Sequence, residues 1–257
     1  MKATQSWSAI DSKLLIKEVA GRLDQPTRRA FLRQSIGLGS LVMLSDCDIT
    51  DGLGAENALR AISRMNDRVQ AWLFDKDRLA PEYPESAITD PFPFNAFYKQ
   101  EEAPDVDPSD FALEASGLVD SKASWTLAEL NQLPQVSQIT RHVCIEGWSA
   151  IGQWSGIRFS DFLVRIGADR RAKYVGFKCA DGYSTSIDMA TALHPQTQLT
   201  LRFRNRTLPR QYGFPMKLRV PTKLGFKNPK HITTIIVTND FPGGFWENYG
   251  YNWFSGL

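Results

Sequence analysis

Cysteine and histidine are scarce in this chain, and their spacing excludes several kinds of metal site. The 257 residues include three cysteines and three histidines: Cys47, Cys144, Cys179, His142, His194 and His231. No pair of cysteines has the C-x-x-C spacing of zinc and iron–sulfur sites, and no C-x-x-C-H haem attachment motif is present. The spacing excludes a c-type haem and argues against a zinc or iron–sulfur site made by this chain alone.

The chain also lacks a glycine-rich phosphate loop, a dinucleotide-binding fingerprint and any internal repeat. Its uncharged apolar run, Ser35–Ser45, is shorter than the roughly 20 residues that span a bilayer. The overall composition, 42% hydrophobic and 23% charged, is typical of a globular protein. These features predict a folded protein that uses neither a nucleotide loop nor a membrane-spanning helix.

Acidic residues are absent between Met189 and Asn239, although this stretch is rich in basic ones. The bases are Arg202, Arg204, Arg206, Arg210, Lys217, Arg219, Lys223, Lys227 and Lys230. By contrast, residues 82–114 are rich in carboxylates and hold one lysine, Lys99. Such a basic region either attracts an anion such as a phosphate or forms a solvated face. The alternating Arg202, Arg204 and Arg206 favour the second alternative, facing solvent or the acidic segment.

The N-terminal segment contains a pattern typical of export signals. Residues 27–33 read TRRAFLR and precede the short apolar run, which resembles a twin-arginine signal. This route exports folded proteins, commonly with a cofactor, so we expect a periplasmic protein that is soluble or membrane-associated. The alternative is an internal amphipathic helix with a chance arginine pair. Cys47 ends a lipoprotein-like LSDC box, but Asp46 stands where a small residue is needed.

Composition shifts divide the chain into three predicted parts: 1–50, an extension with the signal; 51–90, a helix and proline-rich segment; and 91–257, the main domain. In residues 55–75, Ala58, Leu59, Ile62, Met65, Val69 and Trp72 follow one helical stripe. The next segment, 79–110, contains six prolines: Pro81, Pro84, Pro91, Pro93, Pro104 and Pro108. It is expected to cross the domain as an irregular belt.

From Phe111 onward the pattern predicts an α+β fold of short strands with few, short helices. Alternating or β-branched runs predict strands at 111–119, 138–145, 172–180, 197–205, 216–221 and 231–239. Helices are predicted at 125–133, with Thr126 as its cap, and at 159–167, ending at Gly167. The aromatic C-terminal segment 243–257 is expected to line a cleft or contact a partner.

Cys144 lies where a predicted strand ends and a glycine–tryptophan turn follows, in RHVCIEGWSA. A lone cysteine is commonly a small core residue. At the end of a strand, however, a thiolate is also well placed to bind a soft metal.

The segment HVCIEGWSAIGQWSGIRFSDFL resembles the cysteine segment of the sulfite oxidase superfamily of molybdopterin-dependent oxidoreductases. Further segments recur in the same order: NAFY, AKYVGFKC, LPRQYGFPMKLRVP and LGFKNPK. The similarity runs from about Phe92 to Ile236. Within the superfamily, the chain most resembles catalytic subunits of bacterial periplasmic methionine-sulfoxide reductases. The resemblance implies a sulfite oxidase-type fold with mixed sheets and a β-barrel-like core.

The resemblance also implies roles for individual residues. Cys144 matches the catalytic cysteine that binds molybdenum. The residues that match contacts to the pterin or its phosphate are Asn95, Tyr98, Cys179, Tyr212, Lys217, Asn228, Pro229 and Lys230. Three of these matches depart from the family pattern. Cys179 replaces a threonine, Tyr212 replaces another polar residue or histidine, and Lys217 replaces an arginine. Lysine binds a phosphate as a point charge, without the planar fork of arginine.

The resemblance implies a monomeric molybdenum-pterin enzyme that transfers an oxygen atom to or from a small substrate, either a sulfoxide or another oxo compound. Without a haem of its own, it would exchange electrons with a separate partner, a membrane haem b subunit. An alternative is an inactive cofactor- or anion-binding module of the same fold. A nucleic-acid-binding module using the basic stretch is the third hypothesis, and it conflicts with export.

Overall fold

The computed structural model describes residues 52–257. The predicted export signal and Cys47 lie outside this range. Contacts divide the chain into two units, Met1–Ala58 and Leu59–Leu257, and the fold below is that of the second. The predicted boundary between 51–90 and 91–257 stays a prediction. Among the described helices, none combines the length and apolarity that crossing a bilayer requires.

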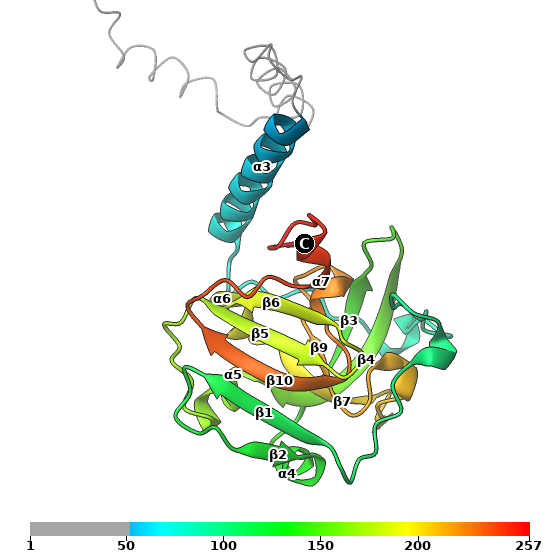
Figure 1. Cartoon of the computed structure of the whole chain (residues 1–257). Helices are drawn as coiled ribbons and strands as arrows, with labels where there is room; N and C mark the ends of the chain where they lie inside the picture. Colours follow the sequence, from blue (N-terminus) through cyan, green and yellow to red (C-terminus); the bar gives the residue numbers. More distant parts are fainter. Residues whose placement is uncertain (1–51) are drawn as a thin grey trace, which may run out of the picture. The chain divides into compact units, whose positions relative to one another are not determined.

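Two five-stranded sheets form the framework of the domain (Figure 1). The first has the order β2 (Ser124–Thr126), β1 (Ala112–Gly117), β10 (Ile232–Thr238), β5 (Tyr174–Cys179) and β6 (Ser184–Asp188). The second has the order β3 (Val136–Val143), β4 (Ser149–Arg158), β7 (Gln198–Phe203) and β8 (Arg206–Thr207), with β9 (Lys217–Arg219) also paired to β7. β1 and β10 pair in parallel, and every other pair is antiparallel. The sheets do not close into one barrel.

The described helices are few, and most are short. They are α3 (Gly52–Leu73), α4 (Leu127–Gln132), α5 (Phe159–Arg165), α6 (Met189–Ala192) and α7 (Phe245–Asn248), with 3₁₀ turns η1 (Glu85–Ala87), η2 (Gln100–Glu102), η3 (Arg210–Tyr212) and η4 (Gly225–Lys227). The predicted cap of α4 is confirmed, since Thr126 and Glu129 form a reciprocal capping box. α5 ends where predicted, since Gly167 follows its last turn with φ +63°.

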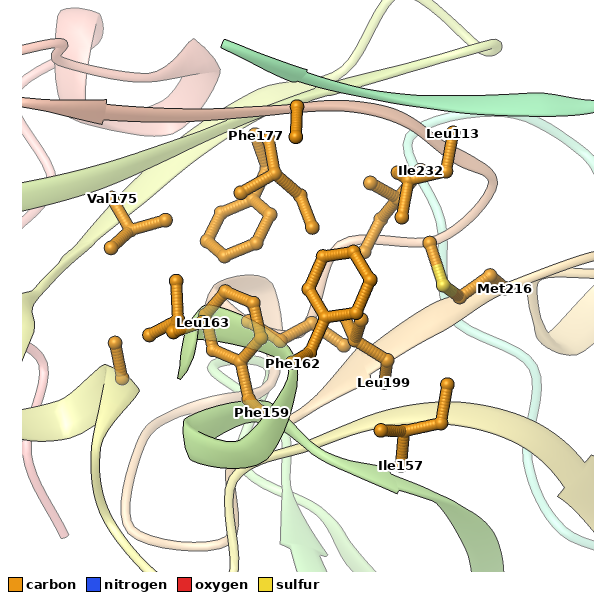
Figure 2. Packing of buried hydrophobic residues seen from close by; sticks show 14 of the residues in the cluster. Leu113, Ile157, Phe159, Phe162, Leu163, Val175, Phe177, Leu199, Met216 and Ile232 are labelled. Atoms are coloured by element: carbon orange, nitrogen blue, oxygen red, sulfur yellow. The ribbon is translucent and has the colours of Figure 1, made fainter. Parts of the chain in front are cut away.

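The main hydrophobic core lies between the two sheets (Figure 2). Val175 and Ile232 extend from the first sheet, while Ile157 and Leu199 extend from the second. α5 adds Phe159, Phe162 and Leu163, which are fully buried. Burying each such side chain contributes about 1.5–3 kcal/mol. This core holds the two sheets together and fixes the loops at their ends.

The proline-rich belt is irregular, as predicted, and crosses the second sheet. Glu82 bridges to Thr140 of β3, and the Thr89 amide donates to the Ile151 carbonyl of β4 at 2.9 Å. Farther along, Arg210 donates to the Ala103 carbonyl. The belt therefore brings residues 92–98 to the end of β3, where Cys144 lies.

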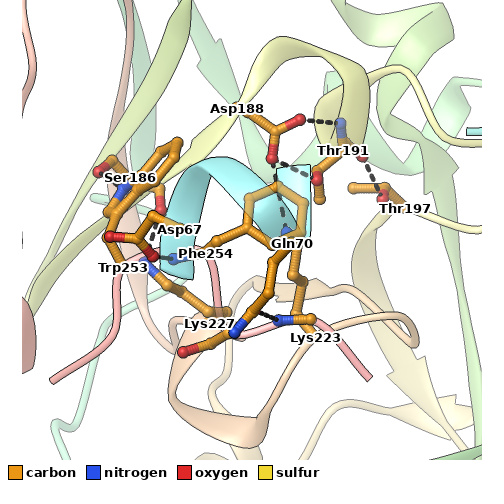
Figure 3. A network of polar contacts seen from close by, with 12 residues as sticks. Asp67, Gln70, Ser186, Asp188, Thr191, Thr197, Lys223, Lys227, Trp253 and Phe254 are labelled. Atoms are coloured by element: carbon orange, nitrogen blue, oxygen red, sulfur yellow. Dashed lines mark hydrogen bonds and ion pairs between the residues drawn. The ribbon is translucent and has the colours of Figure 1, made fainter. Parts of the chain in front are cut away.

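A buried polar network joins α3, β6 and the C-terminal segment (Figure 3). Asp67 accepts the Phe254 amide at 2.7 Å, and Trp253 donates to Ser186 at 2.9 Å. Nearby, Lys227 pairs with Glu247, and both side chains are almost fully buried. The network holds the C-terminal segment in place.

Lys223 lies in this network with its ammonium 3.6 Å from Asp188, too far for a hydrogen bond. It also faces the Phe254 ring, 2.8 Å from the ring centroid. Burial lowers the pKa of Lys223 to about 7, against the raising effect of Asp188. The folded protein therefore loses the proton of the Lys223 ammonium more readily than the unfolded chain does.

The depressed pKa of Lys223 predicts that stability rises with pH. Between about pH 7 and the ordinary lysine value of 10.5, the unfolded chain binds more protons than the folded one. The free energy of unfolding should be measured with urea at pH 7 and at pH 9. Its increase between these two pH values should be about 1–2 kcal/mol larger for wild type than for Lys223→Met. An equal increase in the free energy of unfolding of the two proteins would contradict a depressed pKa at Lys223.

Candidate functional site

The site is a pocket at the C-terminal end of β3, called here the Cys144 pocket. Its lining comes from the belt, the turn after β3, the β5–β6 turn, the η4 loop and α7. The residues are Asn95, Ala96, Phe97, Tyr98, Cys144, Ile145, Glu146, Asp181, Tyr183, Gly225, Phe226, Asn228, Pro229, Lys230 and Trp246. Segments far apart in sequence thus converge on one cysteine.

Local geometry places Cys144 at the start of a tight turn. Its amide donates to the Trp148 carbonyl at 2.9 Å, and the Gly147 amide donates back to the Cys144 carbonyl at 3.2 Å. Gly147 has φ +92°, which a side chain disfavours. The glycine in this motif therefore permits the turn that directs the thiol into the pocket.

The Cys144 thiol is 6% exposed and lies beside a carboxylate. Its sulfur is 3.6 Å from Glu146 Oε2, which also accepts the Trp148 indole N–H at 2.9 Å. Burial raises the pKa of the Cys144 thiol, and the Glu146 charge acts in the same direction. A nucleophilic cysteine needs the opposite shift. Since a coordinated metal deprotonates a thiol outright, the environment suits a metal ligand better.

Lys230 links the η4 loop to the belt. Its ammonium donates to the carbonyls of Asn95 and Gln211, and it lies 4.5 Å from the Phe94 ring centroid. Burial lowers the pKa of Lys230 to about 8. The lysine thus presents a buried positive charge at the pocket wall.

Behind this wall lie two more buried cations. Lys217 is 2% exposed, with its ammonium 4.8 Å from the centroid of the Trp154 indole ring. Burial lowers the pKa of Lys217 well below its ordinary value, and the positive charges of Lys230 and Arg219 add to this effect. Arg219 is fully buried, and burial lowers its pKa to about 9. We call Lys217, Arg219 and Lys230 the cationic cluster.

Arg219 and His142 are the residues that sequence reasoning missed here. Arg219 donates to Asn228 Oδ1 at 2.9 Å and to Thr140 Oγ1 at 3.1 Å, so it orders the loop at the pocket. His142 is buried, but neither ring nitrogen has a hydrogen-bond partner among residues 52–257. The sequence signal for the burial of His142 is the alternation of side chains along β3, which places His142 on the same side of the strand as the buried Thr140.

The predicted site residues fall into two groups. Lining the pocket are Asn95, Tyr98, Cys144, Asn228, Pro229 and Lys230. Within this group, Tyr98 donates to Asp181 at 3.1 Å. The Asn228 side chain is engaged by Arg219, the Val220 amide and the Leu224 carbonyl, so it supports the loop.

The other three predicted residues do not line the pocket. Lys217 lies in the cationic cluster, and Cys179 is buried in the main core. Tyr212 donates to the Phe92 carbonyl and packs against Phe92 and Phe203, in a separate aromatic cluster. The structure therefore gathers the thiol, the belt and the η4 loop, and places Tyr212 elsewhere.

The donor set fits a molybdenum-pterin group. Molybdopterin carries a phosphate group, and the cationic cluster supplies buried basic side chains. Among the described residues, no carboxylate raises the pKa of Lys217 or Arg219. The unpartnered His142 nitrogens add hydrogen-bonding capacity beside them. Isolated buried charges are costly, so an anion would relieve a real penalty. Cys144 supplies one soft ligand on the pocket surface.

Comparison with known proteins shows which family the chain belongs to. The family model "Oxidoreductase molybdopterin binding domain" matches residues 100–246. The "Putative protein-methionine-sulfoxide reductase subunit YedZ1" of Azospira oryzae is 62% identical over 93% of this chain and 92% of its own length. The "Protein-methionine-sulfoxide reductase catalytic subunit MsrP" of Xanthomonas campestris is 31% identical over 54% of this chain. This chain spans 48% of that MsrP.

A solved structure supports the fold. The sulfane dehydrogenase SoxCD of Paracoccus pantotrophus aligns with a TM-score of 0.51 and 18% identity, over 54% of this chain and 40% of that one. At this identity the match concerns the fold alone. It agrees with a mixed fold of two sheets and short helices.

Proposed function

The chain belongs to the family of oxidoreductase molybdopterin-binding domains, and we propose that it reduces sulfoxides in the periplasm. The resemblance to the sulfite oxidase superfamily is confirmed, and with it an oxidoreductase that binds molybdopterin. The observation that carries the finer proposal is the buried Cys144 thiol at a pocket backed by the cationic cluster. The names of the YedZ1 and MsrP relatives support a sulfoxide as substrate.

In this proposal Cys144 binds molybdenum through its thiolate, while Lys217, Arg219 and Lys230 neutralise the pterin phosphate. His142 donates a hydrogen bond to the same group, and Asn95 and Tyr98 hold it from the belt. The roles of Tyr212 and Cys179, which lie outside the pocket lining, stay predictions. When bound, the molybdenum-pterin group would supply two-electron oxygen-atom transfer, by which a sulfoxide, two electrons and two protons give a thioether and water. The protein provides the ligand, the positive field and the shape of the entrance.

The entrance of the pocket suits a thioether or sulfoxide. Phe97 and Trp246 line it, and Phe97 stacks on Phe245 with ring centroids 4.8 Å apart. Sulfur makes favourable contacts with aromatic rings. Glu146, next to the thiol, is placed to hold or release a proton as the sulfoxide oxygen leaves as water.

The electrons for this reaction come from a second subunit, which we propose is a membrane haem b protein. Export with the cofactor bound, by the twin-arginine route, places the chain beside such a partner. A small-molecule substrate and a monomeric catalytic subunit complete the proposal, and nucleic acid plays no part in it. The relatives called subunits support a multi-subunit enzyme.

The test uses the full chain made with its own N-terminal segment. We expect near-stoichiometric molybdenum and oxidation of a reduced viologen dye that depends on added methionine sulfoxide. The outcomes separate the hypotheses. Molybdenum without turnover of any sulfoxide would support the inactive binding module, for which Lys217 in place of arginine is the favouring observation. Folded protein without molybdenum, from cells that make ample cofactor, would overturn both.

A further inference from the structure

The apolar stripe of α3 points away from the domain. Leu59, Ile62, Met65 and Val69 recur at helical spacing, and each is at least 46% exposed. Trp72 continues the stripe and is 82% exposed. A helix on a globular protein normally turns this stripe toward the core. Here its orientation is the reverse of the expected one.

The opposite, polar face of α3 contacts the domain. Ser63, Asp67 and Gln70 are the half-buried positions of the helix after Leu59. Asp67 accepts the Phe254 amide at 2.7 Å, and Gln70 Oε1 accepts the Gly256 amide at 3.0 Å. These hydrogen bonds to the C-terminal segment hold the polar face against the domain. The apolar stripe is therefore left without cover in the part of the chain that the structure describes.

The stripe continues into a neighbouring groove of mixed lining. Leu73, the last residue of α3, lines this groove of about 430 Å³ together with Leu79 and Leu257, and Asp75, Arg78 and Arg141 are the charged residues in its lining. All three leucines are more than half exposed. Contiguous exposed apolar surface of this kind marks an interaction site.

The charges beside the stripe are positive. Arg64 and Arg68 are exposed and lie one turn apart, next to the apolar side of the helix. From Leu59 to Leu73 the one carboxylate is Asp67, which faces the domain and is bonded there. An apolar stripe with an arginine edge and an exposed tryptophan is typical of helices that lie in a membrane interface.

We propose that α3 lies on the surface of an anionic lipid bilayer. Its stripe from Leu59 to Trp72 enters the boundary between headgroups and acyl chains, while Arg64 and Arg68 contact lipid phosphates. Anionic lipid is the occupant that the arginine edge favours, because lipid phosphates supply the negative charge that Arg64 and Arg68 would meet. The polar face stays bonded to the domain throughout.

The test is sedimentation of the full chain with vesicles of phosphatidylcholine containing about a third phosphatidylglycerol, against phosphatidylcholine alone. Wild type should bind the anionic vesicles more tightly, and high salt should weaken this preference. The triple variant Ile62→Gln, Met65→Gln, Val69→Gln should bind about tenfold or more weakly. Arg64→Gln with Arg68→Gln should lose the preference for phosphatidylglycerol.

A matched control changes exposed apolar residues elsewhere, Leu118→Gln with Val164→Gln, and should bind as wild type does. Equal binding by wild type and the triple variant would overturn the proposal and assign the lipid contact to another part of the chain. Absence of vesicle binding would also overturn it. If that absence came with concentration-dependent dimers that the triple variant abolishes, a second copy would be the occupant instead.

Discussion

Replacing Cys144 by serine is expected to lower sulfoxide reduction by more than about 100-fold, because the variant loses the thiolate ligand on the pocket surface. Serine is nearly the same size but is not deprotonated at neutral pH, so it is a poor ligand for a soft metal. The measurements are turnover per chain and the electronic spectrum of the bound metal. The spectrum should change even if some molybdenum is retained.

The control for Cys144→Ser is its folding. Cys144 is at the pocket surface, outside the main core cluster, so thermal unfolding of serine and alanine variants should stay close to that of wild type. A variant that keeps both the wild-type spectrum and full turnover would remove Cys144 from the site. A variant that fails to fold would be replaced by Cys144→Ala before any conclusion is drawn.

Lys217→Met is expected to separate stability from cofactor binding. Without cofactor, the free energy of unfolding of the variant should be about 1–3 kcal/mol higher than that of wild type, because methionine fills the same buried space without an ammonium group. Burial and the charges of Lys230 and Arg219 hold the pKa of Lys217 far below its ordinary value, and this is the penalty that is removed. Binding of the phosphate-bearing cofactor should weaken about 10–100-fold, because one charged partner is lost.

The measurements for Lys217→Met are urea unfolding of cofactor-free protein and molybdenum content of protein as isolated. The matched control is Lys178→Met, since Lys178 on β5 is exposed, and it should change neither. Loss of stability together with unchanged cofactor content would mean that Lys217 acts through packing on Trp154, and not as an anion partner.

The strands and the capped helix α4 could be predicted because their signals are local. Alternation predicted β1, β3, β5, β7 and β10, and Thr126 predicted its capping box. β4 was missed, because its glycines and tryptophans were interpreted as turns. Gly156 is required by tertiary contact: a Cβ there would lie 1.9 Å from the Leu199 carbonyl of β7. No local pattern reveals such a close approach between strands.

The structure brings part of the predicted site together and leaves Cys179, Tyr212 and Lys217 outside the pocket lining. The cysteine motif and the acid-free stretch indicated a thiolate and an anion. The burial of Arg219 depends on tertiary contact between β9 and β3, where Arg219 donates to Thr140 and to the Arg141 carbonyl. The unpartnered nitrogens of His142 likewise follow from packing around β3. Tyr212 was predicted near the cofactor, but its ring packs with Phe92 and Phe203, because three aromatic rings from distant segments meet there.

The sequence by itself determined the class of the protein, several of its strands, its cysteine motif and the amphipathic character of α3, because each depends on residues close together in the chain. Only the tertiary structure decided which charges are buried and which face of α3 meets the domain. The C-terminal segment bonds Asp67 and Gln70, so the polar face docks and the apolar one is left outside. Such partners lie almost 190 residues apart, as Asp67 and Phe254 do, and their meeting follows from the packing of the whole chain.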